Sequence, residues 1–430
     1  MREWSPEQVA QAACGRLVAP APRPSGPERA TIDSRAAGPG DLFVGLVGER
    51  ADGGAFAPQA LAAGAWGVLV APEHAEAAKC AVPGALIAAD DPLAALQRLA
   101  TAWRRALRAK VVGITGSVGK TSTKDILAAM LGQERRTVAN RENYNTDIGL
   151  PLTVLEAPAG TEALILEMGM RGPGQIAELT AIADPDVAVI TSIAPVHLEL
   201  MGSIEAIAAA KAELVAGLRP GATAVIPAGE TLLEPHRRDD IATVTFGPGG
   251  DVDELPDGLE LPFASAHMHR NALAALAAAQ ALGVHPTGRL QVELSSFRGQ
   301  RIELANDIVV VNDCYNANPM SMRAALDDLA ASASGRRVAV LGDMLELGPD
   351  EARFHAEVGA YARDAGVDVL VAVGPRAAHL ADGYGEVVAL PDAQAAAEAL
   401  PALLQPGDTV LLKASRGVGL EVVARALEAA

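Results

Sequence analysis

The residues Gly116-Ser117-Val118-Gly119-Lys120-Thr121 form a motif of the kind that binds phosphate groups. They follow the apolar run Val111 to Ile114, which predicts a buried strand, and Ser122 continues into a predicted apolar-periodic helix. In such a loop, backbone N–H groups and the helix N-terminus bind phosphate oxygens, the lysine neutralises charge, and the Thr hydroxyl can reach a magnesium ion. The usual spacing would put a glycine where Ile114 stands, so a plain glycine turn is the alternative.

Four polar residues after this loop stand at positions where chemistry is possible. Glu167 ends the apolar run in ALILEMG, where a magnesium ligand is expected, although a surface glutamate is the alternative. His197 follows a predicted strand in TSIAPVHLELMGS and should point into the same cleft, unless it is a structural histidine. On spacing alone, Lys211 in IEAIAAAKAELVAGL is a solvated helix lysine. Asn271 in HMHRNALAALAAA opens a predicted helix and could be only its cap.

Charged residues also flank predicted strands in the C-terminal part of the chain. Arg301 in RGQRIEL and Asp313 in VVNDCYNANP lie near its presumed start, and each alone could be a surface charge. Asp313 follows a strand, a position suited to hydrogen-bonding a ribose hydroxyl. Lys413 and Arg416 in LLKASRGVG lie between the last predicted strand and a helix, which is another position that favours anions.

The elements that must position these residues alternate between strand and helix. The chain has 430 residues, too many for one typical domain, and half are hydrophobic, so sizeable cores can form. The alternation predicts an α/β fold with parallel sheets and helices on both faces. We expect a small α/β domain at 1–107, a central phosphate-loop domain at 108–299 and a Rossmann-like domain at 300–430. Three such domains suggest an enzyme that closes on its substrates.

The net charge and the cysteine content indicate which partners and which cellular compartment to expect. The net charge of −18 disfavours nucleic acid and anionic membrane surfaces as general partners, so an anionic nucleotide needs a local site. Cys14, Cys80 and Cys314 are widely spaced and form no metal pattern, which favours reduced thiols and a cytoplasmic location. The N-terminal residues carry acids and do not resemble a signal peptide, and the longest low-charge stretch is too short to span a bilayer. A monomer is expected.

Six segments distributed along the chain carry a resemblance to a known family. They are DSRAAGPGDLFVGLVGERADG, TGSVGKTSTKD, NYNTDIGLPLTVL, ILEMGMRGPGQI, NDCYNANPMSM and LGDMLELG. Together they resemble the Mur ligase family of ATP-dependent amide-bond-forming enzymes, from Asp33 to about Val423. The paired YNANP and GDMxELG motifs indicate the member that joins D-alanyl-D-alanine to UDP-N-acetylmuramoyl-tripeptide in peptidoglycan precursor synthesis. The DNPR motif of the diaminopimelate- or lysine-adding relative is absent.

This resemblance implies a role for each candidate residue. The uridine diphosphate end of the substrate would be held by Ser34, Arg35, Gly48 and Asp52. ATP phosphates and a first magnesium would be bound by residues 116–122, chiefly Lys120 and Thr121, with Glu167. A second magnesium would be held by His197 and by Lys211 in carbamylated form. The rest of the nucleotide would contact Asn271, Arg301 and Asp313. The peptide arm would lie along Asn143, Asn145 and Thr146, and the dipeptide cleft would be shaped by Tyr315, Asn316 and Asn318.

The chain departs from the family pattern at three motifs. Met268 follows His267 where the family has His-Asn, and Ala414 replaces the glycine of a KGSR motif. Gly54 stands where a histidine usually follows the Asp-Gly of the first domain. None of these changes removes a phosphate-binding or metal-binding group.

The resemblance implies that the tripeptide carboxylate attacks the γ-phosphate of ATP and that the dipeptide amine then attacks the acyl phosphate. No convincing set of residues for a protein nucleophile is present, and this mechanism needs none. Another Mur-type ligase or a folylpolyglutamate-type ligase is the alternative of the same class, although the long first domain with DSR argues against the folate enzyme. A non-ligating P-loop nucleotide-binding regulator is the alternative from another class.

Overall fold

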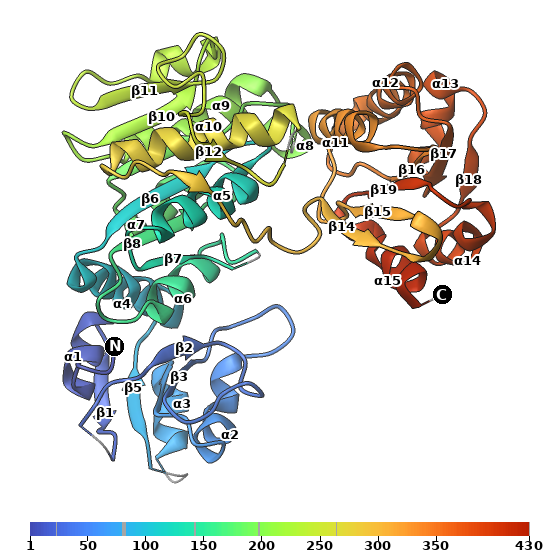
Figure 1. The fold of residues 1–430 in the computed structure, drawn as a ribbon. Coiled ribbons are helices and arrows are strands. Elements are labelled where there is room, and N and C mark those ends of the chain that lie inside the picture. The colour runs from blue at the N-terminus through green and yellow to red at the C-terminus, as the bar shows by residue number, and fades with distance from the viewer. Residues whose placement is uncertain (23, 80–82, 142, 197, 264, 430) are drawn as a thin grey trace.

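Three parallel or mostly parallel sheets organise the chain, each with helices on both faces (Figure 1). The computed structural model describes residues 1–22, 24–79, 83–141, 143–196, 198–263 and 265–429. His197 and Cys80 therefore lie outside the described residues, so the expectations for them stay untested. The three-domain α/β architecture expected from the sequence is confirmed, whereas the boundary positions after residues 107 and 299 stay predictions.

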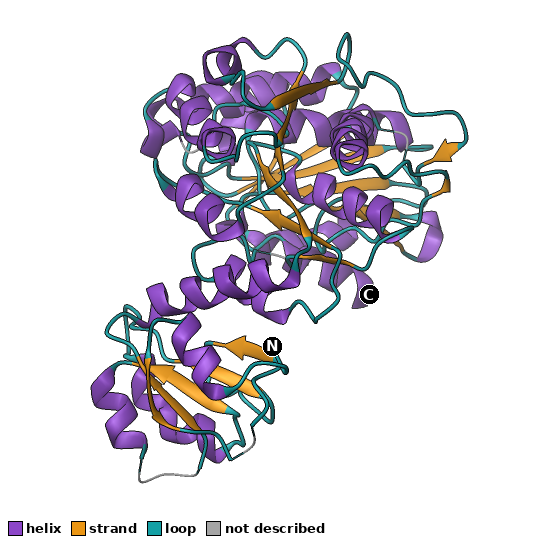
Figure 2. Cartoon of the chain, turned by 90° about the vertical axis from the view of Figure 1, so that its left-hand side faces the viewer, coloured by secondary structure: helices purple, strands orange, loops and turns teal. Residues whose placement is uncertain are grey.

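The first sheet is five-stranded, and its β1 strand runs antiparallel to its neighbour β5. Its strands, in spatial order, are β1 (Arg16–Ala19), β5 (Ala85–Ala88), β4 (Gly67–Val70), β3 (Asp41–Val44) and β2 (Arg29–Thr31). The accompanying helices are α1 (Pro6–Ala12), η1 (Gly53–Phe56), α2 (Ala57–Ala62) and α3 (Pro72–Ala78), and α4 (Pro92–Leu107) leads to the next sheet. In Figure 2 this unit projects away from the other two.

The central sheet has six parallel strands. Their spatial order is β11 (Ala242–Phe246), β10 (Thr223–Pro227), β9 (Val187–Ile190), β6 (Lys110–Thr115), β8 (Ala163–Glu167) and β7 (Thr137–Ala139). The middle strands are apolar and buried along nearly their whole length, as strands covered on both faces must be. Around them lie α5 (Lys120–Gly132), α6 (Gly149–Glu156), α7 (Gln175–Ala183), α8 (Leu198–Met201), α9 (Ile204–Ala216), η2 (Thr231–His236), α10 (Ala266–Ala281) and the pair β12 (Leu259–Glu260) and β13 (Gly288–Arg289).

The third sheet is also six-stranded, and only its edge strand β14 runs antiparallel. Its order is β14 (Gln300–Glu303), β15 (Val309–Asn312), β19 (Thr409–Lys413), β16 (Arg337–Gly342), β17 (Val369–Val373) and β18 (Val388–Leu390). The helices are η3 (Ala305–Asp307), α11 (Pro319–Ser332), η4 (Gly348–Asp350), α12 (Glu351–Asp364), η5 (Ala377–His379), α13 (Leu380–Tyr384), α14 (Ala393–Leu403), η6 (Arg416–Val418) and α15 (Glu421–Ala429). None of the helices in the described ranges is long and apolar enough to cross a membrane.

The apolar cores show which units are packed together. One cluster is continuous from the first sheet to the central sheet, and it includes Trp4 in edge-to-face contact with Trp103 at 5.3 Å between ring centroids. The two clusters of the third sheet contain residues of that domain, and Leu198 of the central domain packs against the edge of one of them. Because little apolar surface joins it to the others, the third domain is the unit best able to move as a rigid body.

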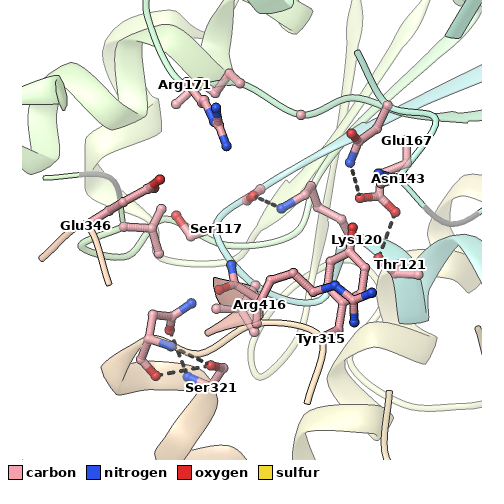
Figure 3. A pocket seen from close by; sticks show the side chains of 18 of the residues that line it. Ser117, Lys120, Thr121, Asn143, Glu167, Arg171, Tyr315, Ser321, Glu346 and Arg416 are labelled. Atoms are coloured by element: carbon pink, nitrogen blue, oxygen red, sulfur yellow. Dashed lines mark hydrogen bonds between the residues drawn. The ribbon is translucent and has the colours of Figure 1, made fainter. Parts of the chain in front are cut away.

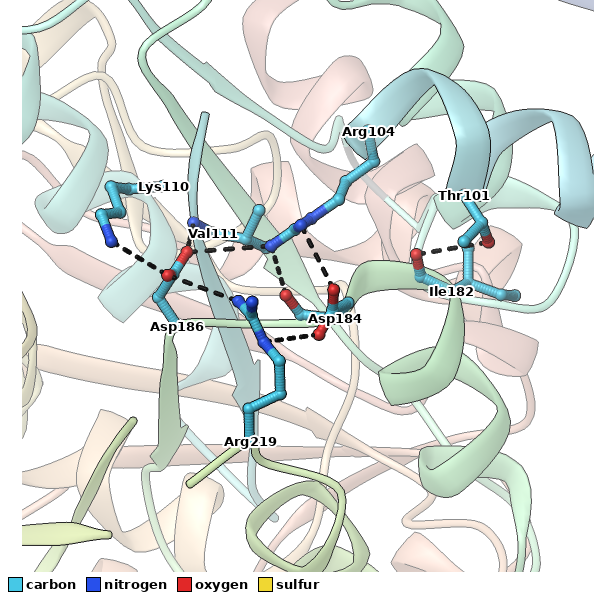
Figure 4. A network of polar contacts seen from close by, with 8 residues as sticks. All are labelled: Thr101, Arg104, Lys110, Val111, Ile182, Asp184, Asp186 and Arg219. Atoms are coloured by element: carbon cyan, nitrogen blue, oxygen red, sulfur yellow. Dashed lines mark hydrogen bonds and ion pairs between the residues drawn. The ribbon is translucent and has the colours of Figure 1, made fainter. Parts of the chain in front are cut away.

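A buried charge network fixes α4 to the amino ends of the central strands (Figure 4). Arg104 is only 8% exposed and pairs with Asp184 at 3.3 Å and with Asp186 at 3.8 Å. Arg219 pairs with the same two carboxylates, and the Val111 N–H donates to Asp186 at 2.9 Å. The shared carboxylates therefore connect the helix between the first two domains to the strand that carries the phosphate loop.

Candidate active site

The phosphate loop has the strand–loop–helix form predicted for it. β6 ends at Thr115 and α5 begins at Lys120, and both Gly116 and Gly119 have positive φ, at 150° and 89°. A Cβ on Gly116 would meet the Thr191 hydroxyl, and a Cβ on Gly119 would meet the Asn271 amide. Both glycines are therefore required by backbone conformation and by close neighbours.

The segment after β9 holds this loop in place. Ser192 accepts a hydrogen bond from the Val118 N–H at 3.0 Å, and the Thr191 hydroxyl donates to the Val118 carbonyl at 2.6 Å. The Ser117 hydroxyl donates to the Ala194 carbonyl and accepts from its N–H, so this side chain is engaged in loop structure. Backbone N–H groups at the helix start thus have a fixed direction, as phosphate binding requires.

Lys120 lies over the loop, where its ammonium donates to the Gly116 carbonyl at 2.9 Å. Burial lowers the pKa of Lys120, the Glu167 carboxylate opposes this change, and the Arg298 guanidinium adds to it. Lys120 and Arg298 therefore share one electrostatic environment. Two cations so close together favour an anion such as a phosphate group between them.

Thr121 and Glu167 lie side by side, as a shared magnesium ion would need (Figure 3). The Thr121 hydroxyl donates to Glu167 Oε2 at 2.8 Å, and the Asn145 amide donates to Oε1 at 3.0 Å. The Glu167 side chain is fully buried, and Asn140 accepts from its backbone N–H at 2.8 Å. These hydrogen bonds orient a carboxylate that is aimed at the phosphate loop.

The oxygen donors near the phosphate loop fit magnesium better than a metal ion that is coordinated by protein ligands alone. Within the described ranges, no group of three or more His, Cys, Asp or Glu side chains could hold a metal ion. Magnesium at nucleotide sites commonly takes one or two protein oxygens and completes its shell with phosphate and water. Thr121 and Glu167 supply two such oxygens.

Lys211 is buried, contrary to the solvated position that its spacing indicated. Its exposed fraction is 3%, and its ammonium makes no hydrogen bond or ion pair with any residue in the described part of the chain. Burial, with the Lys120 ammonium as a second cause, holds the pKa of Lys211 well below its usual value. Lys211 lines the same cavity as Lys120 and Glu167, and its burial there favours the neutral amine over the ammonium.

A cavity of about 900 Å³ joins the central and third domains (Figure 3). From the central domain it is lined by the phosphate loop, Glu167, Lys211 and the predicted peptide-arm residues Asn143, Asn145 and Thr146. From the third domain come the predicted residues Tyr315, Asn316 and Asn318, together with Leu345, Glu346, Leu347, Lys413, Ser415, Arg416 and Gly417. Residues far apart in the sequence thus form one site.

Two of the predicted dipeptide-cleft residues have structural roles as well. Asn318 caps α11, and its side chain accepts from the Ser321 N–H at 2.9 Å. The Tyr315 ring is covered by the Arg298 guanidinium at 3.8 Å from the ring centroid. The cleft wall on this side is therefore stabilised by a helix cap and a cation–π contact.

Four predicted nucleotide residues lie off this cavity. Asn271 lies in the second turn of α10 rather than at its start, because the N-cap is Ser265, and its amide packs against Gly119. Ser122 lies in the first turn of α5, next to Thr121. Arg301 pairs with Asp328 at 3.6 Å, and Asp313 pairs with Lys413 at 2.5 Å. Lys413 itself lines the cavity, so Asp313 lies one side chain away from it.

The predicted substrate residues of the first domain follow the carboxyl ends of β2 and β3. Arg35 forms a bidentate pair with Asp33 at 2.9 and 2.8 Å, and hydrogen bonds from Arg35 lower the pKa of Asp33 to about 2. Asp52 caps η1 and pairs with His74 at 2.7 Å, while the backbone of Gly48 closes a turn. Ser34 lies in the same loop as Arg35. The loops after β2 and β3 lie at the same end of the first sheet, because the two strands are parallel. Neither loop lines the main cavity.

The structure also explains the departures from the family pattern. Met268 packs into the apolar core beneath α10. Ala414 fits because its Cβ faces Gly342, where a second Cβ would be only 2.7 Å away. A Cβ on Gly54 would overlap the His74 ring, so this imidazole occupies the space beside Asp52 that a side chain at position 54 would otherwise fill.

Sequence reasoning missed two arginines that line the cavity, Arg171 and Arg298. Arg298 precedes Gly299 in the segment RGQRIEL, where the sequence pattern indicates only Arg301. Arg171 follows the Glu167 strand in EMGMRG, so its place near the carboxyl end of β8 was the available signal.

Three Mur ligase family models match consecutive parts of the chain. The model of the Mur ligase family catalytic domain matches residues 29–107, that of the Mur ligase middle domain matches 114–279, and that of the Mur ligase glutamate ligase domain matches 297–416.

The relatives of similar length are dipeptide ligases by name. The UDP-N-acetylmuramoyl-tripeptide–D-alanyl-D-alanine ligase of Synechocystis sp. is 41% identical over 410 residues, which cover 91% of this chain and 90% of that protein. A crystal structure of MurF from Acinetobacter baumannii matches with a TM-score of 0.88 and 31% identity, covering 99% of both chains. MurF of Thermotoga maritima, in complex with ADP, matches with a TM-score of 0.79 and 29% identity over 93% of this chain and 97% of that chain.

Proposed function

The chain belongs to the Mur ligase family, and from this premise we propose that it joins D-alanyl-D-alanine to UDP-N-acetylmuramoyl-tripeptide at the expense of ATP. The observation that carries this proposal is the single cavity in which the phosphate loop faces loops of the third domain. A ligase needs such an arrangement, because nucleotide, acid and amine must meet in one place. The reaction would be a step of peptidoglycan precursor synthesis and would take place in the cytoplasm, catalysed by a monomer.

In the first step, a carboxylate oxygen of the tripeptide attacks the γ-phosphorus of ATP, and the bond to the bridging oxygen of ADP breaks. In the second step, the dipeptide nitrogen attacks the acyl carbon, loses a proton and expels inorganic phosphate. Lys120 and Arg298 would neutralise the charge on the transferred group. Beyond charge neutralisation, the two domains would accelerate the reaction mainly by positioning the substrates, so no protein nucleophile is required.

Thr121 and Glu167 would hold the first magnesium ion, which supplies charge neutralisation at the phosphates. We further propose a second ion held by His197 and carbamylated Lys211. The support is the burial of Lys211, its lack of a partner within the described ranges and its depressed pKa, since carbon dioxide reacts only with the neutral amine. The product carbamate is an oxygen ligand of the type that magnesium prefers.

The nucleotide would lie along residues 116–122, with Asn271, whose amide lies beside Gly119, near the adenine. That the Thermotoga relative binds ADP supports a nucleotide site in this chain. Arg301 and Asp313 would reach the phosphate and the ribose after the third domain closes. The uridine diphosphate end would be bound by Ser34, Arg35, Gly48 and Asp52, at the carboxyl ends of two parallel strands where ligands of α/β sheets bind.

The peptide arm would pass Asn143, Asn145 and Thr146, which lie on the cavity wall next to Glu167. Tyr315, Asn316 and Asn318 would shape the dipeptide cleft on the opposite wall. That wall also presents the Glu346 carboxylate and the Arg416 guanidinium, which match the ammonium and carboxylate of a zwitterionic dipeptide.

Phosphate release, measured with each substrate omitted in turn, tests the proposed reaction. We expect release to require both the UDP-linked tripeptide and D-alanyl-D-alanine, and the product mass to exceed that of the tripeptide substrate by one dipeptide less water. Tripeptides with diaminopimelate and with lysine at the third position should be compared in the same assay. ATP turnover that ignores the dipeptide would instead support a nucleotide-binding regulator.

A further inference from the structure

The loop of residues 343–347, which we call the GDM loop, forms part of the cavity wall in the third domain. Leu345, Glu346 and Leu347 line the cavity, whereas the Met344 side chain is fully buried beneath it. Glu346 has a φ of +63°, which is unfavourable for a residue with a side chain. The loop therefore needs firm attachment on both sides to keep this shape.

Neighbouring segments attach three successive residues of the GDM loop. The Asp343 carboxylate accepts from the N–H groups of Arg376 and Ala377 at 2.9 and 2.7 Å. The Leu345 N–H donates to the Ser415 hydroxyl at 2.9 Å. Between them, the Met344 N–H donates to Nε2 of His355 at 3.0 Å.

His355 is fully buried and has no place on the cavity. Its Nδ1 lies 2.7 Å from the Glu351 carbonyl oxygen, which can only accept, so Nδ1 carries the hydrogen. The Met344 N–H can only donate, so Nε2 must be the unprotonated nitrogen. These two partners select one neutral tautomer, because an imidazolium would turn a second N–H toward the Met344 N–H.

The Ser415 hydroxyl connects the GDM loop with the predicted dipeptide cleft. It accepts from the Leu345 N–H and donates to the Ala317 carbonyl at 3.3 Å. Ala317 lies between Asn316 and Asn318, so Ser415 joins two loops that both line the cavity with Lys120. A shift of Met344 would change the shape of this wall without contact between His355 and any substrate.

We propose that neutral His355 is a positioning residue that holds the GDM loop in the shape needed to bind D-alanyl-D-alanine. This inference rests on the proposed ligase function and adds to it a buried residue that acts through the Met344 N–H. It also implies that the dipeptide site is sensitive to acid, because protonation of His355 removes the acceptor that the loop requires.

The surroundings of His355 set the direction of this pH dependence. The charged and titratable groups around the imidazole are Asp343, Glu351, His379 and Arg376, which pairs with both carboxylates. Burial lowers the pKa of His355, although the two acidic residues and the Glu351 carbonyl oppose this. A released His355 would titrate near its ordinary pKa of about 6.5. The attachment is therefore complete above that pH and weakens as the pH falls below it.

Two substitutions of His355 and one matched control test the proposal. Leucine removes the acceptor, and we expect His355→Leu to raise the KM for the dipeptide about tenfold or more while the KM for ATP stays nearly constant. Glutamine places an amide oxygen near the position of Nε2 and does not titrate, so His355→Gln should restore most of the dipeptide affinity. His285→Gln, at an exposed histidine of the central domain away from the cavity, should leave both constants unchanged.

The pH profile of kcat/KM for the dipeptide gives a second readout. The dipeptide amine titrates equally in every variant, so the ratio of the wild-type and His355→Gln profiles isolates the imidazole. We expect this ratio to fall toward acid. An identical acid limb in both proteins, or an unchanged dipeptide KM in His355→Leu with only a lower melting temperature, would overturn the proposal.

Nitrogen NMR of labelled histidine in the wild-type protein needs neither a folded variant nor turnover. A neutral His355 with its hydrogen on Nδ1 at pH 7 is the expected result, and a hydrogen on Nε2 would refute the proposal. If the wild-type protein formed no ligated product, the proposed function would fail instead, and the NMR result would still report the tautomer.

Discussion

The Thr121 hydroxyl donates a 2.8 Å hydrogen bond to Oε2 of Glu167, although the two residues are 46 positions apart in the chain. One lies in the first turn of α5 and the other ends β8, the neighbour of β6 in the sheet. Parallel strands bring their carboxyl ends to one edge, so a strand-end carboxylate meets the helix that follows the phosphate loop. A magnesium ion could replace the shared hydrogen with little movement of either side chain.

Changes to this pair should raise the magnesium requirement. We expect Glu167→Gln and Thr121→Ala each to need roughly ten- to a hundredfold more magnesium for half-maximal phosphate release, because the first removes the negative charge of a ligand and the second removes a hydroxyl ligand. Thr121→Ser keeps the hydroxyl and should stay close to wild type. Thr231→Ala, at an exposed threonine of the central domain away from the cavity, is the matched control. Equal magnesium dependence in all four variants would contradict the assignment.

The sequence predicted the elements that carry their own local signal. The predicted strand Val111 to Ile114 lies within β6, and the apolar run that Glu167 ends is β8, because a buried parallel strand is a continuous apolar run between polar segments. β7 has only three residues, and β14 is an edge strand whose residues are mostly exposed. Such strands are defined by their partners in the sheet rather than by their own composition.

The same distinction applies to the site. The phosphate loop could be predicted because its residues are consecutive and each type has a separate role. The burial of Lys211 could not, because its helix offers no sign of which face packs against the sheet and the phosphate loop. Arg298 reaches the cavity through its contact with Tyr315, and His355 acts through a loop eleven residues earlier. Long-range packing decides all three positions.

Arg298 should matter for the use of ATP. Its guanidinium lines the cavity, covers Tyr315 and shares the environment of Lys120. We expect Arg298→Ala to lower kcat/KM for ATP by about a hundredfold, since the cavity loses a positive charge that would stabilise the transferred phosphate. Arg298→Lys keeps the charge without the planar contact and should be intermediate. Arg289→Ala, at an exposed arginine on β13, serves as the control, and the idea fails if Arg298→Ala behaves like it.

The third domain should approach the central domain when substrates bind. Arg301 and Asp313 lie off the cavity, and the third domain shares little apolar surface with the rest of the chain. Small-angle scattering should therefore show a smaller radius of gyration with a non-hydrolysable ATP analogue and the UDP-linked tripeptide. Asp313→Ala should weaken the use of ATP and leave binding of the UDP-linked substrate nearly intact, whereas Asp382→Ala should affect neither. Equal loss of both would indicate that the substitution unfolds the domain.

The charge network at the amino ends of the central strands should govern stability rather than chemistry. Asp186→Ala leaves Arg104 and Arg219 with one carboxylate between them and removes the acceptor of the Val111 N–H. We expect the free energy of unfolding to fall by about 3 kcal/mol, because Arg104 is buried. Asp364→Ala breaks an exposed pair with Arg363 and should cost less than about 1 kcal/mol. Urea denaturation measures both, and activity per folded molecule should be unchanged, because Asp186 lies at the opposite end of the sheet from the cavity.

Enzyme activity should depend on carbon dioxide, because Lys211 should need to be carbamylated. A buried ammonium beside Lys120 would repel magnesium, whereas a carbamate would bind it, so the modification and the second ion should assist each other. We expect Lys211→Ala to lose most activity and to recover part of it when a small carboxylate such as formate fills the space. Lys211→Arg keeps a positive charge and should not recover, and neither should Lys120→Ala, where the missing group is a cation.

Carbon-13 NMR after equilibration with labelled bicarbonate should show a carbamate signal in the wild-type protein that is absent from Lys211→Ala. Full activity of Lys211→Ala would mean that the second ion has another ligand or is not needed. Loss of activity with neither rescue nor a carbamate signal would leave Lys211 as a buried packing residue, because only a ligand role predicts that an added anion replaces the side chain.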